Sequence, residues 1–160
     1  MCCALFTSCW NGLAFRTDER LTITAPRDRA EVTLPVTARW KVRDFEVTGP
    51  TSRAKTDAGY FGVFVDRAPQ PPGERFAWFA RNDRQCLPVE GCPNEKYFTD
   101  RGVFSARDTS FTLETLPSTV PVGSTRREFH EITVVLLDGT GRRIGESSWF
   151  AQFQVRREED

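Results

Sequence analysis

Cys86 and Cys92, in the middle of the chain, are spaced so that their thiols can meet. Five residues separate them, and among these Pro88 and Gly91 can bend the chain. A disulfide would add about 2 kcal/mol by the loop-entropy estimate, and it would favour an oxidising compartment. Two reduced thiols are the alternative. A shared zinc site is the weakest alternative, because zinc favours about two to four residues between paired ligands and the chain has no second compact Cys or His pair.

Three further cysteines, Cys2, Cys3 and Cys9, lie at the start of the chain. The run Phe6-Thr-Ser-Cys9 resembles the end of a bacterial lipoprotein signal, in which a small residue precedes the cysteine that receives the lipid. A working signal needs a basic segment and about 7–15 apolar residues, more than is present here. Three interpretations stay open: a true start that lies upstream, an accidental likeness, or a small bridge between Cys3 and Cys9. Under the first, Cys9 is the lipidation candidate.

His130 is the one histidine of the chain, and this limits catalytic and metal chemistry. No Gly-x-Ser-x-Gly motif accompanies it, and it stands in register with Ile132, Val134 and Leu136 on one face of a strand. We therefore expect a half-buried histidine at a strand start, no enzymatic activity, and no metal or cofactor. Loop carboxylates such as Asp138 lack the Asp-x-Asp-x-Asp spacing of calcium loops, so they are expected to cap turns.

The elements that must position these residues are strands. Residues 21–25 read as a short strand ended by Pro26, and residues 32–42 alternate apolar with polar side chains, which specifies a strand with one buried face. Pro35 has no N–H for the ladder, so this strand should lie at an edge or carry a bulge. Residues 60–66 are nearly all apolar, as expected of a central strand covered on both faces.

Later segments continue this pattern. Residues 76–80 form a second apolar run, expected to be the returning strand, and 110–116 alternate again. The end of the chain predicts a hairpin, because two alternating strands flank the Asp-Gly-Thr-Gly turn at 138–141, where glycine suits the positive φ angles. Gly145 predicts a bulge or a close-packing site in the second strand. No segment shows a sustained helical period.

The length and the net charge of the chain limit which class of protein it can be and which partners it can have. The chain has 160 residues, the size of one ordinary domain, and its 22 basic residues equal its 22 acidic ones. Zero net charge removes the bulk electrostatic case for binding nucleic acid or an anionic membrane. No apolar run reaches the roughly 18 residues of a membrane-spanning helix. Thirteen Phe and four Trp argue against disorder.

Three segments carry a family resemblance. LTITAPRDRAEVTLPVTARWKV, FGVFVD and HEITVVLLDGTGRRIGESSWFAQFQV resemble bacterial immunoglobulin-like (Ig-like) and fibronectin type III-like domains. In those domains a short strand ends in Pro, a long Val-rich strand follows, and a hairpin closes the chain. The resemblance implies an all-β fold: an antiparallel β-sandwich of about seven strands.

The residue patterns, together with this resemblance over 21–155, set the expected organisation of the chain. Residues 1–20 are a lead-in and a candidate remnant of an export or lipoprotein signal, 21–155 form one β-sandwich domain, and 156–160 are a charged tail. A loop-rich insertion at 67–107 interrupts the domain.

The insertion is where binding residues are expected. Loops held on a rigid scaffold commonly carry binding, and aromatic side chains dominate interface energetics. The binding candidates are Phe76, Trp78, Phe79, Tyr97 and Phe98. The alternative is that these rings complete the core, and a mixture of the two is also consistent with the pattern.

Together these features predict a non-catalytic Ig-like binding or adhesion module, exported or anchored at the cell surface, whose partner is a protein. The alternative is a structural or decoration subunit of a larger assembly, such as a phage tail or a contractile injection particle, which would work in the cytoplasm as part of that particle. The thiols of Cys86 and Cys92 discriminate between the two, because a disulfide belongs with the first.

Overall fold

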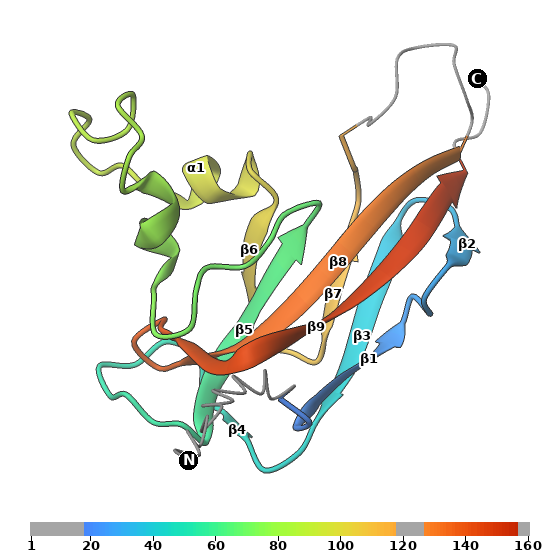
Figure 1. The fold of residues 1–160 in the computed structure, drawn as a ribbon, viewed down its shortest axis with the longest axis horizontal. Helices are drawn as coiled ribbons and strands as arrows, with labels where there is room; N and C mark the ends of the chain where they lie inside the picture. Colours follow the sequence, from blue (N-terminus) through green and yellow to red (C-terminus); the bar gives the residue numbers. More distant parts are fainter. Residues whose placement is uncertain (1–17, 118–126, 157–160) are drawn as a thin grey trace, which may run out of the picture.

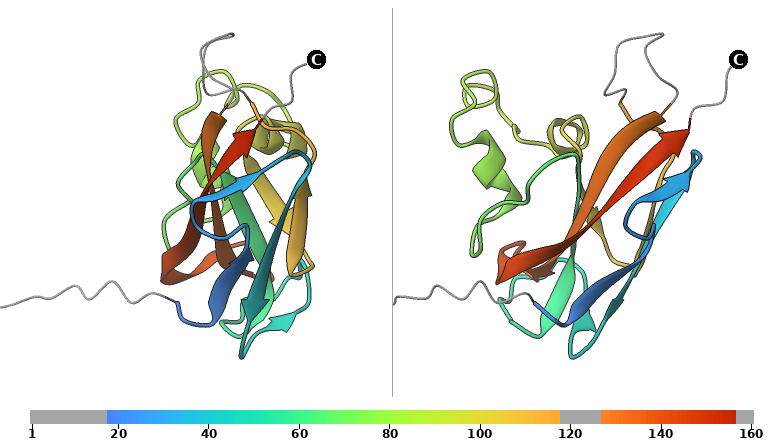
Figure 2. Two further views of the ribbon diagram at one scale, coloured as in Figure 1. Left: turned by 90° about the vertical axis from the view of Figure 1, so that its right-hand side faces the viewer. Right: turned by 45° about the vertical axis from the view of Figure 1, so that its right-hand side comes forward.

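The computed structural model describes residues 18–117 and 127–156, in which two β-sheets pack face to face (Figures 1 and 2). The smaller sheet has the order β1 (Leu21–Ala25), β3 (Val36–Val42), β7 (Ser110–Leu113). The larger sheet has the order β2 (Ala30–Val32), β9 (Arg143–Arg156), β8 (Arg127–Asp138), β5 (Ala58–Val65), β4 (Glu46–Val47), and β6 (Val103–Ala106) also pairs with β5. The predicted all-β class is confirmed.

The main core lies between the two sheets. Alternate residues of the strands face inward, so Trp40 of β3 meets Phe61 of β5 edge-on, with ring centroids 5.3 Å apart. Ile132 and Val134 of β8 and Phe153 of β9 belong to the same buried cluster. This inward set is the one that the alternation predicts.

The stretch predicted as one strand over 32–42 is divided between the two sheets. β2 ends at Val32 and pairs with β9 of the larger sheet, whereas β3 begins at Val36 in the smaller sheet. The predicted edge position is confirmed for β2, which lies at one edge of the larger sheet, and is wrong for β3, which lies between β1 and β7. Pro35 falls where the chain crosses from one sheet to the other, and there its missing N–H needs no ladder partner.

Strand pairing is mostly antiparallel, as expected, but not throughout. β2 pairs with β9 in parallel, and β4 pairs with β5 in parallel. The described residues form nine strands rather than about seven, because β2 and β4 are short segments of three and two residues. Alternation over so few residues leaves no readable signal.

β5 is the central strand that its apolar run predicts, and seven of its eight residues are buried. The prediction of a returning strand at 76–80 is wrong, because these residues form the 3₁₀ helix η1 (Phe76–Ala80). The strand that returns alongside β5 is instead β6, with Phe64 opposite Val103. A short apolar run does not distinguish a buried strand from a buried helical turn.

The predicted C-terminal hairpin is confirmed as β8 and β9. Asp138 caps its turn, since Oδ1 accepts hydrogen bonds from the backbone N–H of Thr140 (2.8 Å) and of Arg142 (3.0 Å). The predicted irregularity at Gly145 is confirmed as well: the register shifts between Val134 and Leu136, and Gly145 has φ +77°.

Some predictions concern residues outside the described ranges. Cys2, Cys3 and Cys9, with most of the lead-in 1–20 and all but the first residue of the tail 156–160, lie there. Within the described ranges, no helix has the length and apolarity needed to cross a membrane.

Candidate binding surface on the insertion

The insertion covers one end of the outer face of the larger sheet, beside β5 (Figures 1 and 2). Phe64 of β5 points outward from the main core, yet its side chain is 0% exposed. The ring of Phe76 meets it edge-on at 5.9 Å, and the ring of Phe79 lies at 6.0 Å. Phe98 extends the stack, 5.5 Å from Phe76. The insertion therefore has a hydrophobic cluster of its own, built on the back of the sheet.

This packing decides where the predicted binding aromatics lie. Three of them are half-buried in that cluster: Phe76, Phe79 and Phe98. This agrees with the alternative stated above, in which the rings complete a core and do not bind a partner. Trp78 and Tyr97 are also half-buried, but an arginine lies over each ring. The five residues thus form one contiguous packed layer, and a role for any of them in binding stays a prediction.

Arginine side chains cover the open faces of three of these rings. The guanidinium carbon lies 3.4 Å from the ring centroid for Arg81 over Trp78, and 3.8 Å for Arg101 over Tyr97. Arg67 stands 4.2 Å from the ring centroid of Phe79. Planar guanidinium groups are favourable on aromatic faces, so these contacts hold the layer together while leaving charge at its surface.

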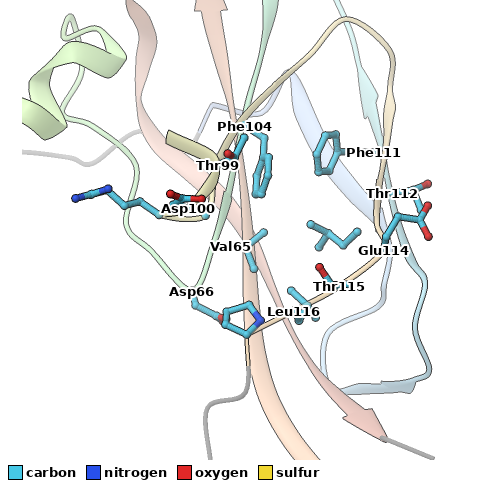
Figure 3. A pocket seen from close by; sticks show the side chains of 14 residues that line it. Val65, Asp66, Thr99, Asp100, Phe104, Phe111, Thr112, Glu114, Thr115 and Leu116 are labelled. Carbon is cyan, nitrogen blue, oxygen red and sulfur yellow. The ribbon is translucent and has the colours of Figure 1, made fainter. Parts of the chain in front are cut away.

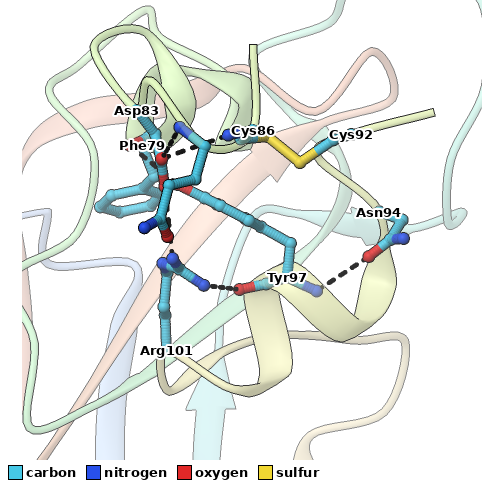
Figure 4. The surroundings of a disulfide bond; sticks show 8 residues. Phe79, Asp83, Cys86, Cys92, Asn94, Tyr97 and Arg101 are labelled. Carbon is cyan, nitrogen blue, oxygen red and sulfur yellow. Dashed lines mark hydrogen bonds and ion pairs between the residues drawn. A yellow bond between two sulfur atoms is a disulfide. The ribbon is translucent and has the colours of Figure 1, made fainter. Parts of the chain in front are cut away.

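Asp83 anchors the base of the loop that follows η1 (Figure 4). Its Oδ2 accepts hydrogen bonds from the Tyr97 hydroxyl (2.9 Å) and from Arg101 (3.3 Å), and its Oδ1 accepts from the backbone N–H of Gln85 (2.9 Å) and of Cys86 (3.2 Å). The Tyr97 hydrogen bond, followed by the backbone ones, lowers the pKa of the Asp83 carboxyl. A carboxylate with four donors is stable in its charged form.

The disulfide loop, residues 86–92, projects from this base. The sulfur atoms of Cys86 and Cys92 lie at bonding distance, with the two Cα atoms 5.4 Å apart. Asn94 then caps the helix α1 (Glu95–Thr99), its side-chain oxygen accepting from the Tyr97 N–H at 2.9 Å. Both ends of the loop are therefore fixed to the same Tyr97-centred structure.

Two large apolar side chains stand out from the disulfide loop. Leu87 is 63% exposed and Val89 is 55% exposed. Sequence reasoning did not single them out. A signal was present, because a loop of this size closed by a disulfide has no interior in which an apolar side chain can be buried. Two such residues on a fixed support are suited to contact another protein rather than to perform chemistry.

His130 is buried rather than half-buried, which corrects the expectation. Its Nδ1 lies 2.7 Å from Asp66 Oδ2, and its Nε2 lies 3.5 Å from Oε2 of Glu128, which is also buried. The side chain is 0% exposed, so no substrate reaches the ring. In the described part of the chain, no three His, Cys, Asp or Glu side chains are grouped so as to hold a metal ion.

A second concave surface, which we call the lateral cleft, opens between the two sheets where β6 and β7 form their edges (Figure 3). It is a cavity of about 660 Å3. In its lining, Phe104 and Phe111 pack against each other with ring centroids 5.0 Å apart. The apolar lining residues are Val65, Phe104, Phe111, Leu113, Leu116 and Pro117.

Comparisons of the chain with protein-family models, with curated proteins and with solved structures found no match.

Proposed function

We propose that this chain is a non-catalytic, Ig-like binding module that acts outside the cytoplasm and contacts a protein partner through the disulfide loop. The observation that carries the proposal is the exposure of Leu87 and Val89 on a loop whose two ends are both fixed. Preorganised loops lose little conformational entropy on binding, and exposed apolar side chains supply the favourable burial.

The strand order supports the Ig-like part of the proposal. In Ig domains, strands A, B and E share one sheet and strands C, F and G share the other. Here β1, β3 and β7 form one sheet, and β5, β8 and β9 lie together in the other. The last two strands form the closing hairpin, as F and G do. The insertion then occupies the connection between strands C and E.

The disulfide supports a location outside the cytoplasm. Disulfides persist in oxidising compartments and are rare in the cytosol. Alkylating the thiols of the protein in its native cells before digestion measures this directly. We expect Cys86 and Cys92 to resist alkylation until a reductant is added; if both are alkylated at once, the proposed location is wrong.

The interface is tested by a photo-crosslinking amino acid placed at Leu87 in the full chain, in its native cells. The matched control is the same amino acid at Val47 of β4, another exposed apolar residue. We expect a discrete crosslinked protein from position 87 alone, and its loss in a variant that also carries Cys86→Ser and Cys92→Ser. Equal crosslinks from both positions, or none from position 87, contradict the proposal.

One observation favours the second candidate, a subunit of a larger assembly. Phe129 and Phe150, on the outer face of β8 and β9, are 68% and 55% exposed. Exposed aromatic rings on a sheet favour contact with a neighbouring subunit. Light scattering on the purified chain, with Phe129→Lys beside it, separates the two: a monomer insensitive to this change favours the binding module.

A further inference from the structure

The lateral cleft is bordered by two strand edges that carry no neighbour within the described residues. β7 pairs with β3 on one side, and β6 pairs with β5 on one side. At the opposite side of the fold, the chain runs from β1 in one sheet to β2 in the other. An unpaired edge presents a row of backbone donors and acceptors to any extended segment that approaches.

The register of β7 fixes which backbone groups point into the cleft. The Trp40 N–H donates to the Thr109 carbonyl at 3.0 Å, so Thr109 turns its backbone groups toward β3. In an antiparallel pair, alternate residues bond to opposite sides. Ser110 and Thr112 therefore turn their N–H and C=O groups away from β3, toward the open edge.

The side chains around the cleft suit an added strand. Alternate residues of a strand point to opposite faces, so one set of an added strand's side chains would enter the apolar space between Phe104, Leu113 and Leu116. The other set would lie on the outer face beside Thr112, which is exposed and polar. A segment with alternating apolar and polar residues matches both environments.

The charges of the lining point to a basic segment. The charged lining residues are Asp66, Asp100 and Glu114 against Arg101. Arg101 is paired with Asp83, and Asp100 is paired with Lys96. Asp66 is also engaged, by the His130 ring and by the backbone N–H of Glu131. The Glu114 carboxylate has no such partner among the described residues, so a Lys or Arg of the bound segment would be favoured beside it.

We propose that the lateral cleft binds an extended segment of a partner protein as an added strand on the open edge of β7. The segment carries apolar residues at alternate positions and a basic residue beside Glu114. Backbone hydrogen bonds to Ser110 and Thr112 supply part of the affinity, and the apolar side chains that enter the cleft supply specificity. This site is separate from the disulfide loop, so it stands whether or not the proposed function does.

The test uses a short fluorescein-labelled peptide in which Val and Thr alternate and Lys stands at both ends. Its binding to the full chain is followed by fluorescence anisotropy. Two peptides serve as controls: a scrambled one without alternation, and one with N-methylated backbone amides, which cannot donate to β7. We expect saturable binding of the first peptide only, with slower amide hydrogen exchange at Ser110 and Thr112.

Two variants examine the two sources of affinity. Thr112→Pro removes an N–H that faces the open edge, and the loss of one hydrogen bond should weaken binding about fivefold. Glu114→Arg reverses the charge of the rim and should weaken binding by a similar factor, about fivefold. Glu46→Arg, on β4, is the matched charge reversal and should leave the affinity unchanged.

Circular dichroism and thermal melts establish that each variant is folded. If Thr112→Pro does not fold, Glu114→Arg and the N-methylated peptide still decide the question. The proposal is overturned if no peptide binds at concentrations up to about 1 mM, because a Kd weaker than that is too weak for a specific site. It is also overturned if the N-methylated peptide binds as well as the first, or if Glu114→Arg and Glu46→Arg have equal effects.

Discussion

The attachment of the insertion to the sheet can be measured as the coupling between Phe64 and Phe76. The two rings meet edge-on with centroids 5.9 Å apart, and Phe64 is 0% exposed. Aromatic pairs in this geometry are worth about 0.5–1.5 kcal/mol beyond the area that they bury. We expect Phe64→Leu and Phe76→Leu each to cost about 1–2 kcal/mol in the free energy of unfolding. The double variant should cost about 1 kcal/mol less than their sum.

The assay is urea unfolding of the wild type, the two single variants and the double variant. The matched control cycle pairs Phe64→Leu with Phe111→Leu, because Phe111 packs against Phe104 in the lateral cleft and not against Phe64. This control should be additive within about 0.3–0.5 kcal/mol. If the Phe64–Phe76 cycle is equally additive, the insertion does not depend on the outer face of the sheet, and the account of the aromatic layer is wrong.

Three further predictions concern single residues. Replacing Cys86 by Ser should lower the free energy of unfolding by about 2 kcal/mol, and a reductant should lower that of the wild type equally, as urea titrations with and without it would measure. Tyr97→Phe removes the first cause of the lowered pKa of Asp83, so this pKa should rise in a carboxyl NMR titration. Because the folded pKa of Asp83 is depressed, this carboxylate stabilises the folded state at pH values above its unfolded pKa of about 3.9, and the stabilisation is lost as the pH falls through the folded pKa. Tyr97→Phe should therefore make the loss of stability at acid pH smaller. Gly102→Ala should cost more than about 1–2 kcal/mol by thermal melt, because Gly102 has φ +68° and an added Cβ would collide with the Val65 carbonyl.

An interaction of the candidate surface can be predicted from the sequence when its two residues lie close together along the chain. The Cys86–Cys92 pairing and the cap at Asp138 depend on residues a few positions apart, so spacing predicts them. The Asp83–Tyr97 hydrogen bond joins residues 14 positions apart, and Tyr97 lies on α1, a helix that sequence reasoning did not foresee. The short disulfide-closed loop indicates that Leu87 cannot be buried inside the loop itself, but whether another segment covers it is decided by the tertiary structure.

The sequence by itself determined β3, β5 and the closing hairpin. Three local signals identify them: the alternation over 36–42, the continuous apolar run of β5 and the glycine turn of the last hairpin. Each signal reflects which residues of a strand are buried or how the backbone turns, so it can be read from neighbouring residues. Only the tertiary structure decided which sheet each strand joins, that 76–80 is helical, and that the outer face of β5 is covered. The last two outcomes depend on Phe64 meeting rings that lie 12 or more positions away in the chain, and a contact of that range leaves no period in the sequence.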